Sequence, residues 1–427
     1  FSKILEKLVA KRLQSFLDKH KMIHDNQFGF RKNHNTTSAV AFLCDEIIQN
    51  YEKGLSVLGV FIDLQKAFDT IDHSILIDKL RHYGIRGVAL QWFISYLKER
   101  TQSVQIRHTK SLKLSINCGV PQGSILGPIL FIIYINDIQN FGESKKLLYA
   151  DDTNLFIPGK NINELIVKMN KELSELSEWL IANKLSLNAS KTHYVLFNPG
   201  RVGPRHSPTT NLVINNCILS EKSSTMFLGV VLDSKLNWGE HIFYIRKKIA
   251  KNVGIINKVK HSLNSQTLRT LYFSLIYPYM IYCIECWGSA TQTRTTPLTI
   301  LQKRCVRTMT HSSPRSPSLP IFRRLNILPF HLVYQLCVLI FMYRYSTASL
   351  PAPNMNMFKS RSDYNAYRTR NNSLLQIPRF KHSNSQKTIS FTGVNFWNSL
   401  PPSLHSTTSF SSFKRLVKLR LWSTTRI

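Results

Sequence analysis

Residues 147–156 read Leu147-Leu148-Tyr149-Ala150-Asp151-Asp152-Thr153-Asn154-Leu155-Phe156, with two adjacent carboxylates between apolar runs. The flanking apolar and aromatic residues are typical of β-strands, so the pattern predicts a hairpin with Asp151 and Asp152 at its turn. A turn presents both carboxylates at one exposed tip, where they could hold hard divalent cations, which prefer oxygen ligands. Asp is also common in ordinary polar turns, so this stretch alone leaves both interpretations open.

A third acid follows a buried strand. Residues 55–63 form a nearly continuous apolar run, which predicts a buried strand with Asp63 at its carboxyl end. The segment after it predicts a helix to about Tyr83, and Asp69 and Asp72 have roles available at the start of that helix. A carboxylate at the end of a buried strand indicates a function.

A Gly- and Pro-rich loop lies between these acidic segments. Residues 118–128 read Cys-Gly-Val-Pro-Gln-Gly-Ser-Ile-Leu-Gly-Pro and precede a strongly apolar helix to about Ile138. Glycines allow backbone to approach a ligand closely, although a single Gly-rich loop is a weak signal.

Hydrophobic periodicity predicts the remaining elements. Helices are expected over residues 1–20, from about 36 to 50, and over 90–98 and 161–183. Strands are expected over residues 103–106, 112–116 and 227–233, and a further strand is expected to end at residue 197. A loop is expected over residues 199–210. A basic helical pattern begins at residue 239, and helical patterns continue to about 345. Residues 346–385 predict a flexible stretch, and residues 391–422 predict a compact final piece.

Charge is distributed very unevenly along the 427 residues, which carry a formal net charge of +32. Residues 1–240 contain 29 Lys and Arg against 22 Asp and Glu, a net of +7, whereas residues 241–427 contain 27 against 2, a net of +25. A basic field of this kind, with aromatics interleaved, favours a polyanionic partner such as nucleic acid. A solvated or membrane-facing basic surface is the alternative.

Seven scattered Cys without framework spacing indicate reduced thiols in an intracellular protein. Cys283, Cys286, Cys305 and His311 could supply four zinc ligands. However, Cys283 and Cys286 lie in an apolar, aromatic stretch, which favours core packing.

The chain begins at Phe1 within a helical pattern, without a basic and apolar leader, so we expect a fragment of a longer protein that is not secreted. The longest apolar runs are shorter than the ~20 residues that a bilayer span needs, and no membrane partner is expected.

Taken together, the motifs occur in an order that resembles reverse transcriptases, specifically those of jockey-like non-long-terminal-repeat (LINE-type) retrotransposons. The resemblance is carried by residues 61–69 (FIDLQKAFD), 119–128 (GVPQGSILGP), 149–152 (YADD) and 185–192 (LSLNASKT), with 27–31 (QFGFR) and 227–230 (FLGV) beside them. It covers roughly residues 1–345, and residues 397–401 (WNSLP) resemble the C-terminal end of the same elements.

The resemblance implies an α+β fold of the right-hand polymerase type with a basic C-terminal extension. Residues 1–54 would be the fingers, 55–238 the palm with finger elements, 239–345 a helical thumb and 346–427 the basic C-terminal region. The expected activity is that of an RNA-directed DNA polymerase.

The implied chemistry is nucleotidyl transfer with two Mg²⁺ ions. Asp63 and Asp151 would bridge both ions and Asp152 would support them. Lys191 corresponds to the family's lysine that can protonate departing pyrophosphate, a role that a cation could also fill by charge alone.

Further residues are implied to contact the substrates. Phe68 would crowd a ribose 2′-hydroxyl and favour deoxynucleotides; alternatively, it is a core aromatic of the following helix. Gln122 would contact the incoming nucleotide, and Arg31 the template or triphosphate.

Nucleic-acid contacts are expected from the segment 227–230, including Gly229, at the primer end. Residues of the basic helix would follow the duplex backbone: Arg246, Lys247, Lys248 and Lys251. The implied partners are an RNA template, a DNA primer, deoxynucleoside triphosphates and the element RNA as a ribonucleoprotein, in nucleus and cytoplasm.

Several family features lie outside this sequence. Residues 241–427 hold only Glu285 and Asp363 as acids, too few for a ribonuclease H site. The family's endonuclease and Arg-Pro finger motif would precede Phe1. An inactive, truncated RNA-binding remnant is therefore the alternative function, and a host-domesticated RNA-binding protein is a more distant one.

Overall fold

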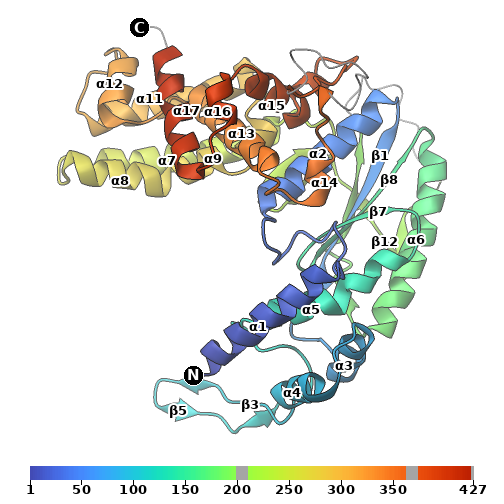
Figure 1. Ribbon diagram of the computed structural model, residues 1–427. Coiled ribbons are helices and arrows are strands. Elements are labelled where there is room, and N and C mark those ends of the chain that lie inside the picture. Colours follow the sequence, from blue (N-terminus) through green and yellow to red (C-terminus); the bar gives the residue numbers. More distant parts are fainter. Residues whose placement is uncertain (199–209, 362–373, 425–427) are drawn as a thin grey trace. The chain divides into compact units, whose positions relative to one another are not determined.

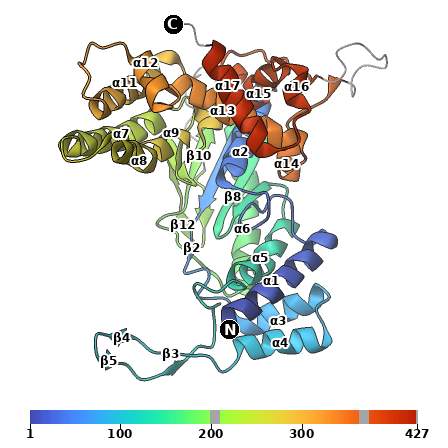
Figure 2. The same ribbon diagram turned by 60° about the vertical axis from the view of Figure 1, so that its left-hand side comes forward.

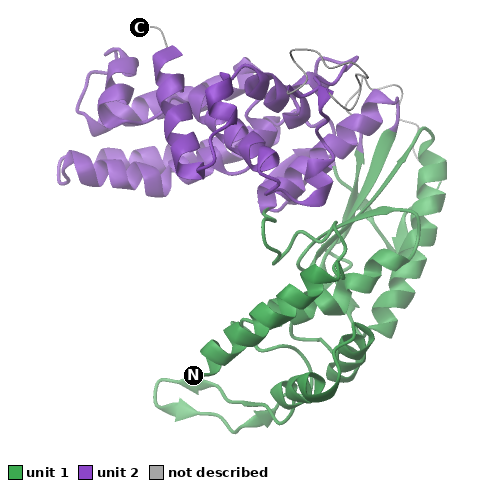
Figure 3. Ribbon diagram, viewed as in Figure 1, with its two compact units in different colours: residues 1–35, 56–196, 203–222 green, residues 36–55, 197–202, 223–427 purple. Residues whose placement is uncertain are grey.

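The computed structural model describes residues 1–198, 210–361 and 374–424. The chain divides into two compact units (Figure 3). The first contains the described parts of residues 1–35, 56–196 and 203–222, and the second those of residues 36–55, 197–202 and 223–427. The mixed helix and sheet content confirms the predicted α+β class. The predicted borders of fingers, palm, thumb and C-terminal region remain predictions.

The first unit is built on a five-stranded sheet with the order β13-β10-β1-β8-β7. β7 (Lys145–Tyr149) and β8 (Asp152–Gly159) form the predicted hairpin, and β8 pairs antiparallel with β1 (Ser56–Ile62). On the other side of β1 lies β10 (His193–Phe197), which pairs in parallel with β13 (Ser220–Glu221). β1 is buried along almost its whole length, as its continuous apolar run predicts.

Helices cover this sheet. α6 (Ile162–Ala182) contacts β1 and β8 (Figure 1) and buries an apolar stripe with helical spacing that includes Leu165, Met169, Leu173 and Leu176. α5 (Gly127–Ile135) is apolar on all sides and almost entirely buried, and the 3₁₀-helix η1 (Asn136–Asn140) follows it. The other helices of the unit are α1 (Ser2–Lys19), α3 (His73–His82) and α4 (Gly87–Leu97).

Short strand pairs complete the first unit. β2 (Leu64–Gln65) pairs with β9 (Ser186–Leu187), and β11 (Val213–Ile214) with β12 (Cys217–Ile218). An arm that follows α4 stands away from the neighbouring helices (Figure 2) and contains β3 (Thr101–Gln102), β4 (Gln105–Ile106), β5 (Thr109–Lys110) and β6 (Leu114–Ser115). The strands expected over 103–106 and 112–116 are thus shorter than predicted, because this arm has no packed face.

The second unit is mainly helical, as predicted for the C-terminal half. It contains α2 (Thr36–Glu52), the hairpin of β14 (Ser224–Phe227) and β15 (Val230–Asp233), and α7 (Gly239–Val259). There follow α8 (Ser265–Leu275), α9 (Tyr277–Ile281), α10 (Ile284–Trp287), α11 (Gln292–Met309), α12 (Ser318–Leu325), α13 (Phe330–Ser346), α14 (Ala352–Met355), η3 (Ser385–Lys387), α15 (Ile389–Asn398), α16 (Pro402–His405) and α17 (Phe410–Thr424).

α13 is the centre of this unit. It is apolar around most of its circumference and contacts α9, α10, α11, α15 and α17. Tyr343 stacks on Phe413 of α17, with ring centroids 4.4 Å apart, and Trp397 of α15 stacks on His405 at 4.8 Å. The compact final piece predicted for residues 391–422 is therefore confirmed, since it shares this core.

Two predictions from the sequence fail, and a third holds only in part. The strand expected over 227–233 is a hairpin, because Leu228 (φ +46°) and Gly229 (φ +77°) form a turn in its middle. The flexible stretch expected over 346–385 is wrong where the structure describes it: Asn354 is fully buried and donates from Nδ2 to the Ser38 carbonyl at 2.9 Å. Asp72 caps α3 through Ser74 and Ile75 N–H groups, but Asp69 does not cap that helix. The loop expected over 199–210 lies almost entirely outside the described residues.

The cysteines considered for zinc are packed in the core. Cys283, Cys286 and Cys305 are buried, whereas His311 is exposed. Burial raises the pKa of Cys283 and of Cys305 to about 12, and among the described residues no group of three His, Cys, Asp or Glu side chains could hold a metal ion. Core packing, the favoured interpretation of the sequence, accounts for their positions.

No single helix in the described ranges is both long and apolar enough to cross a bilayer. Taken together, α12 and α13 are long and apolar enough, but the two helices are bent by 45° where the chain passes from one to the other.

Candidate active site

The Asp151–Asp152 turn lies at the tip of the β7–β8 hairpin, as predicted. Tyr149 is opposite Asp152 in the ladder, and Ala150 adopts a left-handed conformation with φ +57°. Such a conformation is unusual for a residue with a Cβ atom and marks a turn that its surroundings must hold. Ala150 is buried, whereas both Asp residues are exposed.

Asp63 comes to the same place from a different part of the chain. The β1–β8 ladder ends with Ile62 opposite Thr153, so the next step places Asp63 beside Asp152. Partial desolvation by the surrounding chain, together with the charges of Asp151 and Asp63, raises the pKa of Asp152 to about 6. The three carboxylates therefore form one shared electrostatic site.

The segment after β9 holds Asp63 in place. Asn188 donates from its backbone N to the Asp63 carbonyl and from Nδ2 to Asp63 Oδ2, both at 2.8 Å. The Asp63 backbone N donates to Thr192 Oγ1 at 3.4 Å. Sequence reasoning selected only Lys191 from residues 185–192 and missed Asn188 and Thr192. Their presence in the same motif was the available signal, but their contacts depend on the β2–β9 pairing.

Lys191 forms an ion pair with this acid. Its Nζ lies 3.7 Å from Asp63 Oδ2, and its side chain is 70% exposed. The pair is too exposed to contribute much to stability, and the role of Lys191 as a proton donor remains a prediction.

Phe68 lies beside the site in a turn and not within a helix. Its ring stacks on Phe131 of α5 at 4.3 Å and meets Phe30 edge-on at 6.2 Å. The side chain is only partly buried. One face of the ring is thus fixed by the core while part of it remains accessible, which suits a steric contact with a substrate.

The Gly-rich loop packs against the turn that follows Asp63. Gln122 Nε2 donates to Asp69 Oδ1 at 2.9 Å, and the Val120 N–H donates to the Phe68 carbonyl at 2.9 Å. Gly119 has φ +81°, and a Cβ atom there would lie 2.7 Å from the Asp69 carbonyl oxygen. Gly119 therefore allows the loop to pack closely against the backbone of Asp69. Sequence reasoning considered Asp69 only for the start of the following helix and did not predict its bond to Gln122, because the two residues are 53 positions apart.

Arg31 is engaged within its own loop. Its guanidinium donates to the carbonyls of His24, at 2.8 Å, and Gln27, at 3.4 Å, and lies 3.9 Å from Asp25. Burial lowers the pKa of Arg31 from its usual value. These bonds do not bring Arg31 to the carboxylates, and its contact with template or triphosphate remains a prediction.

Gly229 occupies the β14–β15 turn in the second unit. A Cβ atom on it would lie 3.2 Å from Cε1 of Tyr282, and Tyr282 Oη donates to the Leu228 carbonyl at 2.7 Å. Tyr282, which sequence reasoning did not select, therefore supports this turn from α9's C-terminal end.

The basic face of α7 is exposed, as its amphipathic pattern predicts. It carries Arg246, Lys247, Lys248 and Lys251. Phe243 and Tyr244 are also exposed, and Lys247 Nζ lies 4.3 Å from the centroid of the Phe243 ring. Cations interleaved with accessible rings are typical of surfaces that bind nucleic-acid backbones and bases.

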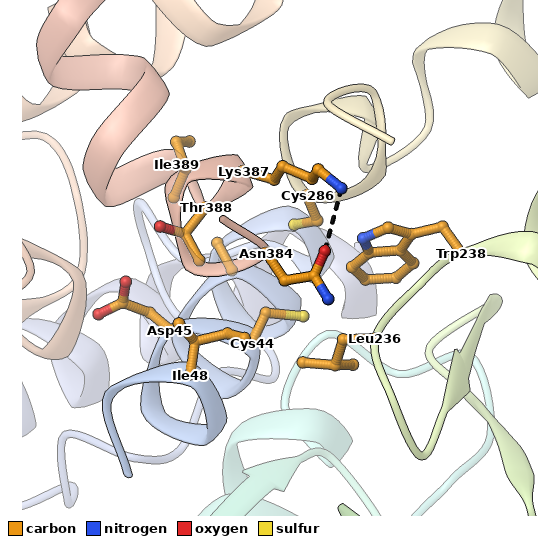
Figure 4. Close-up of a pocket in the computed structure, with 11 residues that line it drawn as sticks. Cys44, Asp45, Ile48, Leu236, Trp238, Cys286, Asn384, Lys387, Thr388 and Ile389 are labelled. Atoms are coloured by element: carbon orange, nitrogen blue, oxygen red, sulfur yellow. Dashed lines mark hydrogen bonds between the residues drawn. The ribbon is translucent and has the colours of Figure 1, made fainter. Parts of the chain in front are cut away.

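A small pocket lies elsewhere within the second unit (Figure 4). Cys44 of α2 and Cys286 of α10 lie at it with Trp238, and Lys387 Nζ donates to Asn384 Oδ1 at 3.0 Å across one side. A hydrogen bond with Cys44, together with burial, raises the pKa of Cys286 well above its usual value. None of the predicted site residues lines this pocket.

The donor chemistry of the first-unit site fits divalent cations, because carboxylate oxygens are the ligands that Mg²⁺ prefers and because Asp151 and Asp63 both raise the pKa of Asp152. Across the described ranges, no three His, Cys, Asp or Glu side chains converge closely enough to coordinate one ion as they stand. Asp63 Oδ2 is instead engaged by Asn188 and Lys191.

Comparisons with known proteins agree with the motif order. A sequence model of the family described as "Reverse transcriptase (RNA-dependent DNA polymerase)" matches residues 1–232. A probable RNA-directed DNA polymerase from transposon BS of Drosophila melanogaster is 29% identical over 343 residues, which cover 76% of this chain and 37% of the relative. The RNA-directed DNA polymerase from mobile element jockey of the same species is 28% identical over 320 residues, covering 71% and 34%.

The chain thus spans about a third of the length of these curated relatives. Among solved structures, apo telomerase from Candida Tropicalis aligns with a TM-score of 0.42 and 12% identity, over 81% of this chain and 59% of that chain.

Proposed function

This chain belongs to the reverse transcriptase (RNA-dependent DNA polymerase) family, and we propose that it is the polymerase portion of a jockey-like non-long-terminal-repeat retrotransposon protein. The proposed activity is extension of a DNA primer on an RNA template with deoxynucleoside triphosphates. The observation that carries the proposal is the strand register that places Asp63 beside the Asp151–Asp152 turn, where the charges of Asp63 and Asp151 raise the pKa of Asp152.

The carboxylates of Asp63, Asp151 and Asp152 would hold two Mg²⁺ ions. When bound, such ions activate the attacking primer oxygen and stabilise the charge on the leaving pyrophosphate. For this arrangement Lys191 must release Asp63 Oδ2, from which it is 3.7 Å away. The released ammonium group is then free to donate a proton to pyrophosphate.

The neighbouring residues would position the nucleotide. Phe68 would lie against the sugar, where the core stack on Phe131 prevents its ring from yielding to a 2′-hydroxyl. Gln122 would contact the incoming nucleotide, and its bond to Asp69 would fix it when the site is empty. Arg31 would contact template or triphosphate after exchanging one of its backbone carbonyl partners.

The second unit would contribute backbone contacts. Gly229 would lie at the primer end, and the α7 residues Arg246, Lys247, Lys248 and Lys251 would neutralise phosphates. A ribonucleoprotein with the element RNA, present in cytoplasm and nucleus, is the proposed setting.

Primer extension tests the proposal. Purified chain is incubated with oligo(dT) on poly(rA), dTTP and Mg²⁺, and compared with an Asp151→Ala, Asp152→Ala double variant. Loss of extension in the double variant is expected, with full extension by Asp78→Ala, which removes an exposed acid from α3. Equal products from the wild type and the double variant would contradict the proposal. RNA binding without any extension would favour the inactive remnant.

A further inference from the structure

The segment before Arg31 extends the sheet at its outer edge. Gln27 forms a parallel bridge with Leu148 of β7. The Phe28 N–H donates to the Leu148 carbonyl at 2.8 Å, and the Leu148 N–H donates to the Asn26 carbonyl at 3.0 Å. Residues 26–28 therefore lie beside β7 just before the chain enters the turn at Ala150.

The Gln27 side chain reaches that turn directly. It is completely buried, and its Oε1 accepts from the Gly29 N–H at 2.8 Å and from the Ala150 N–H at 3.2 Å. Gly29 makes the approach possible, because a Cβ atom there would lie 2.2 Å from the Ala150 nitrogen. The amide group thus joins two segments that are 123 positions apart.

This bond acts on the strained residue of the turn. Ala150 has φ +57°, a strained conformation for a residue with a Cβ atom that persists only where the surroundings fix it. Its N–H is in a buried residue, where a donor without an acceptor is destabilising. Without Gln27, the turn loses the contact that selects this conformation.

We propose that Gln27 is a positioning residue: its Oε1 fixes the Ala150 conformation and thereby sets the directions of Asp151 and Asp152. The inference rests on the proposed function, because it concerns the same metal-binding carboxylates. Gln27 acts only through the turn, since a fully buried side chain does not touch substrate.

Gln27→Met tests this directly, because methionine has a similar length but lacks the acceptor. Ser144→Ala is the matched control: it removes a buried hydrogen bond to Glu172 Oε2, 2.7 Å long, just before β7 and thus at the strand end away from the turn. Both variants lose buried hydrogen bonds next to β7, two in Gln27→Met and one in Ser144→Ala, and only Gln27→Met affects the turn.

Three measurements are made on the full chain. Hydrogen exchange at residues 149–152 should become at least roughly tenfold faster in Gln27→Met, while Ser144→Ala leaves it unchanged. Mn²⁺ binding, followed by electron paramagnetic resonance without turnover, should weaken several-fold. The kcat for dTTP addition should fall on the order of 100-fold, with KM for primer–template within about twofold, since misplaced reacting groups mainly slow the chemical step.

Unchanged exchange at the turn, or unchanged Mn²⁺ affinity, in Gln27→Met would overturn the inference. A wild-type chain that binds Mn²⁺ but extends no primer contradicts the proposed function alone, because the exchange and Mn²⁺ comparisons still decide the role of Gln27. If Gln27→Met does not fold, Gly29→Ala tests the same contact, since its Cβ displaces the Ala150 nitrogen. It should change exchange and Mn²⁺ affinity in the same direction, and failure to do so counts against the inference.

Discussion

Lys191 Nζ lies 3.7 Å from Oδ2 of Asp63, so the predicted proton donor and the predicted metal ligand form an ion pair with each other. Asn188 Nδ2 binds the same oxygen at 2.8 Å. The carboxylate is therefore held by a cation and an amide that nucleotide and metal ions would have to displace. This arrangement links the two functions that the sequence assigned to separate residues.

Lys191→Arg separates acid catalysis from charge. Arginine keeps the positive charge but has a pKa above 12 and does not release its proton. If Lys191 protonates pyrophosphate, we expect the rate of single-nucleotide addition to fall about 100-fold, with metal dependence nearly unchanged. Rapid-quench measurement of a single addition checks this.

The control for that experiment is Lys184→Arg, because Lys184 also pairs with an acid, Asp72, at 2.6 Å. It should leave the rate unchanged. A Lys191→Arg chain with wild-type speed would show that charge alone is sufficient.

Phe68→Ala should weaken the discrimination against ribonucleotides. Without the ring that stacks on Phe131, a 2′-hydroxyl meets no obstacle, and we expect relative ribonucleotide incorporation to rise by roughly 10- to 100-fold. Competition between dTTP and UTP on poly(rA) measures the ratio. Phe30→Ala, which removes the exposed edge-on neighbour, serves as the control. An unchanged ratio in Phe68→Ala would assign Phe68 to the core only.

Lysines on α7 should determine part of the salt dependence of binding. The affinity for a nucleic acid falls as salt rises, and the slope of log affinity against log salt reflects the number of phosphate contacts. If Lys247 and Lys251 each contact a phosphate, this slope should be smaller in magnitude by about 2 in the Lys247→Gln, Lys251→Gln variant. Fluorescence anisotropy with an RNA–DNA duplex at several salt concentrations measures this slope. Lys168→Gln, Lys171→Gln on the exposed face of α6 is the matched control. If the α7 variant and the α6 control change this slope equally, α7 does not contact the nucleic acid.

Glu285 should make stability depend on pH. Burial raises the pKa of its carboxyl to about 7, against a lowering effect of Arg344, and Oε2 has no hydrogen-bond partner among the described residues. Because the folded pKa exceeds the unfolded value, the folded state binds more protons, and the free energy of unfolding decreases as pH rises from about 4.5 to about 7.

Glu285→Gln removes this dependence, since glutamine does not titrate. We compare the free energy of unfolding of the variant with that of the wild type at each pH. The difference in favour of the variant should be larger at pH 8 than at pH 5 by on the order of 2 kcal/mol. Urea unfolding at both pH values measures it, with the exposed Glu240→Gln as control. Parallel pH profiles for wild type and Glu285→Gln would refute the assignment.

Local patterns determined a large part of this structure. The apolar run before Asp63 predicted β1, the 3.6-residue stripe of residues 161–183 predicted α6, and the apolar runs around Asp151 and Asp152 predicted the hairpin. These predictions succeed because side-chain periodicity depends on the few residues that share one element. The turn at Leu228 and Gly229 was missed, because an apolar residue in a left-handed conformation leaves no periodic signal.

By itself, the sequence determined the family and the residue types of the site: Asp63, Asp151 and Asp152 as acids, Lys191 as the cation and Phe68 as the aromatic. Only the tertiary structure decided which residues hold them. Asn188 binds Asp63, Asp69 binds Gln122, and Gln27 binds the turn at Ala150. Hydrogen bonds between residues 53 to 125 positions apart depend on strand pairing and on the closeness of whole segments, which no local pattern encodes.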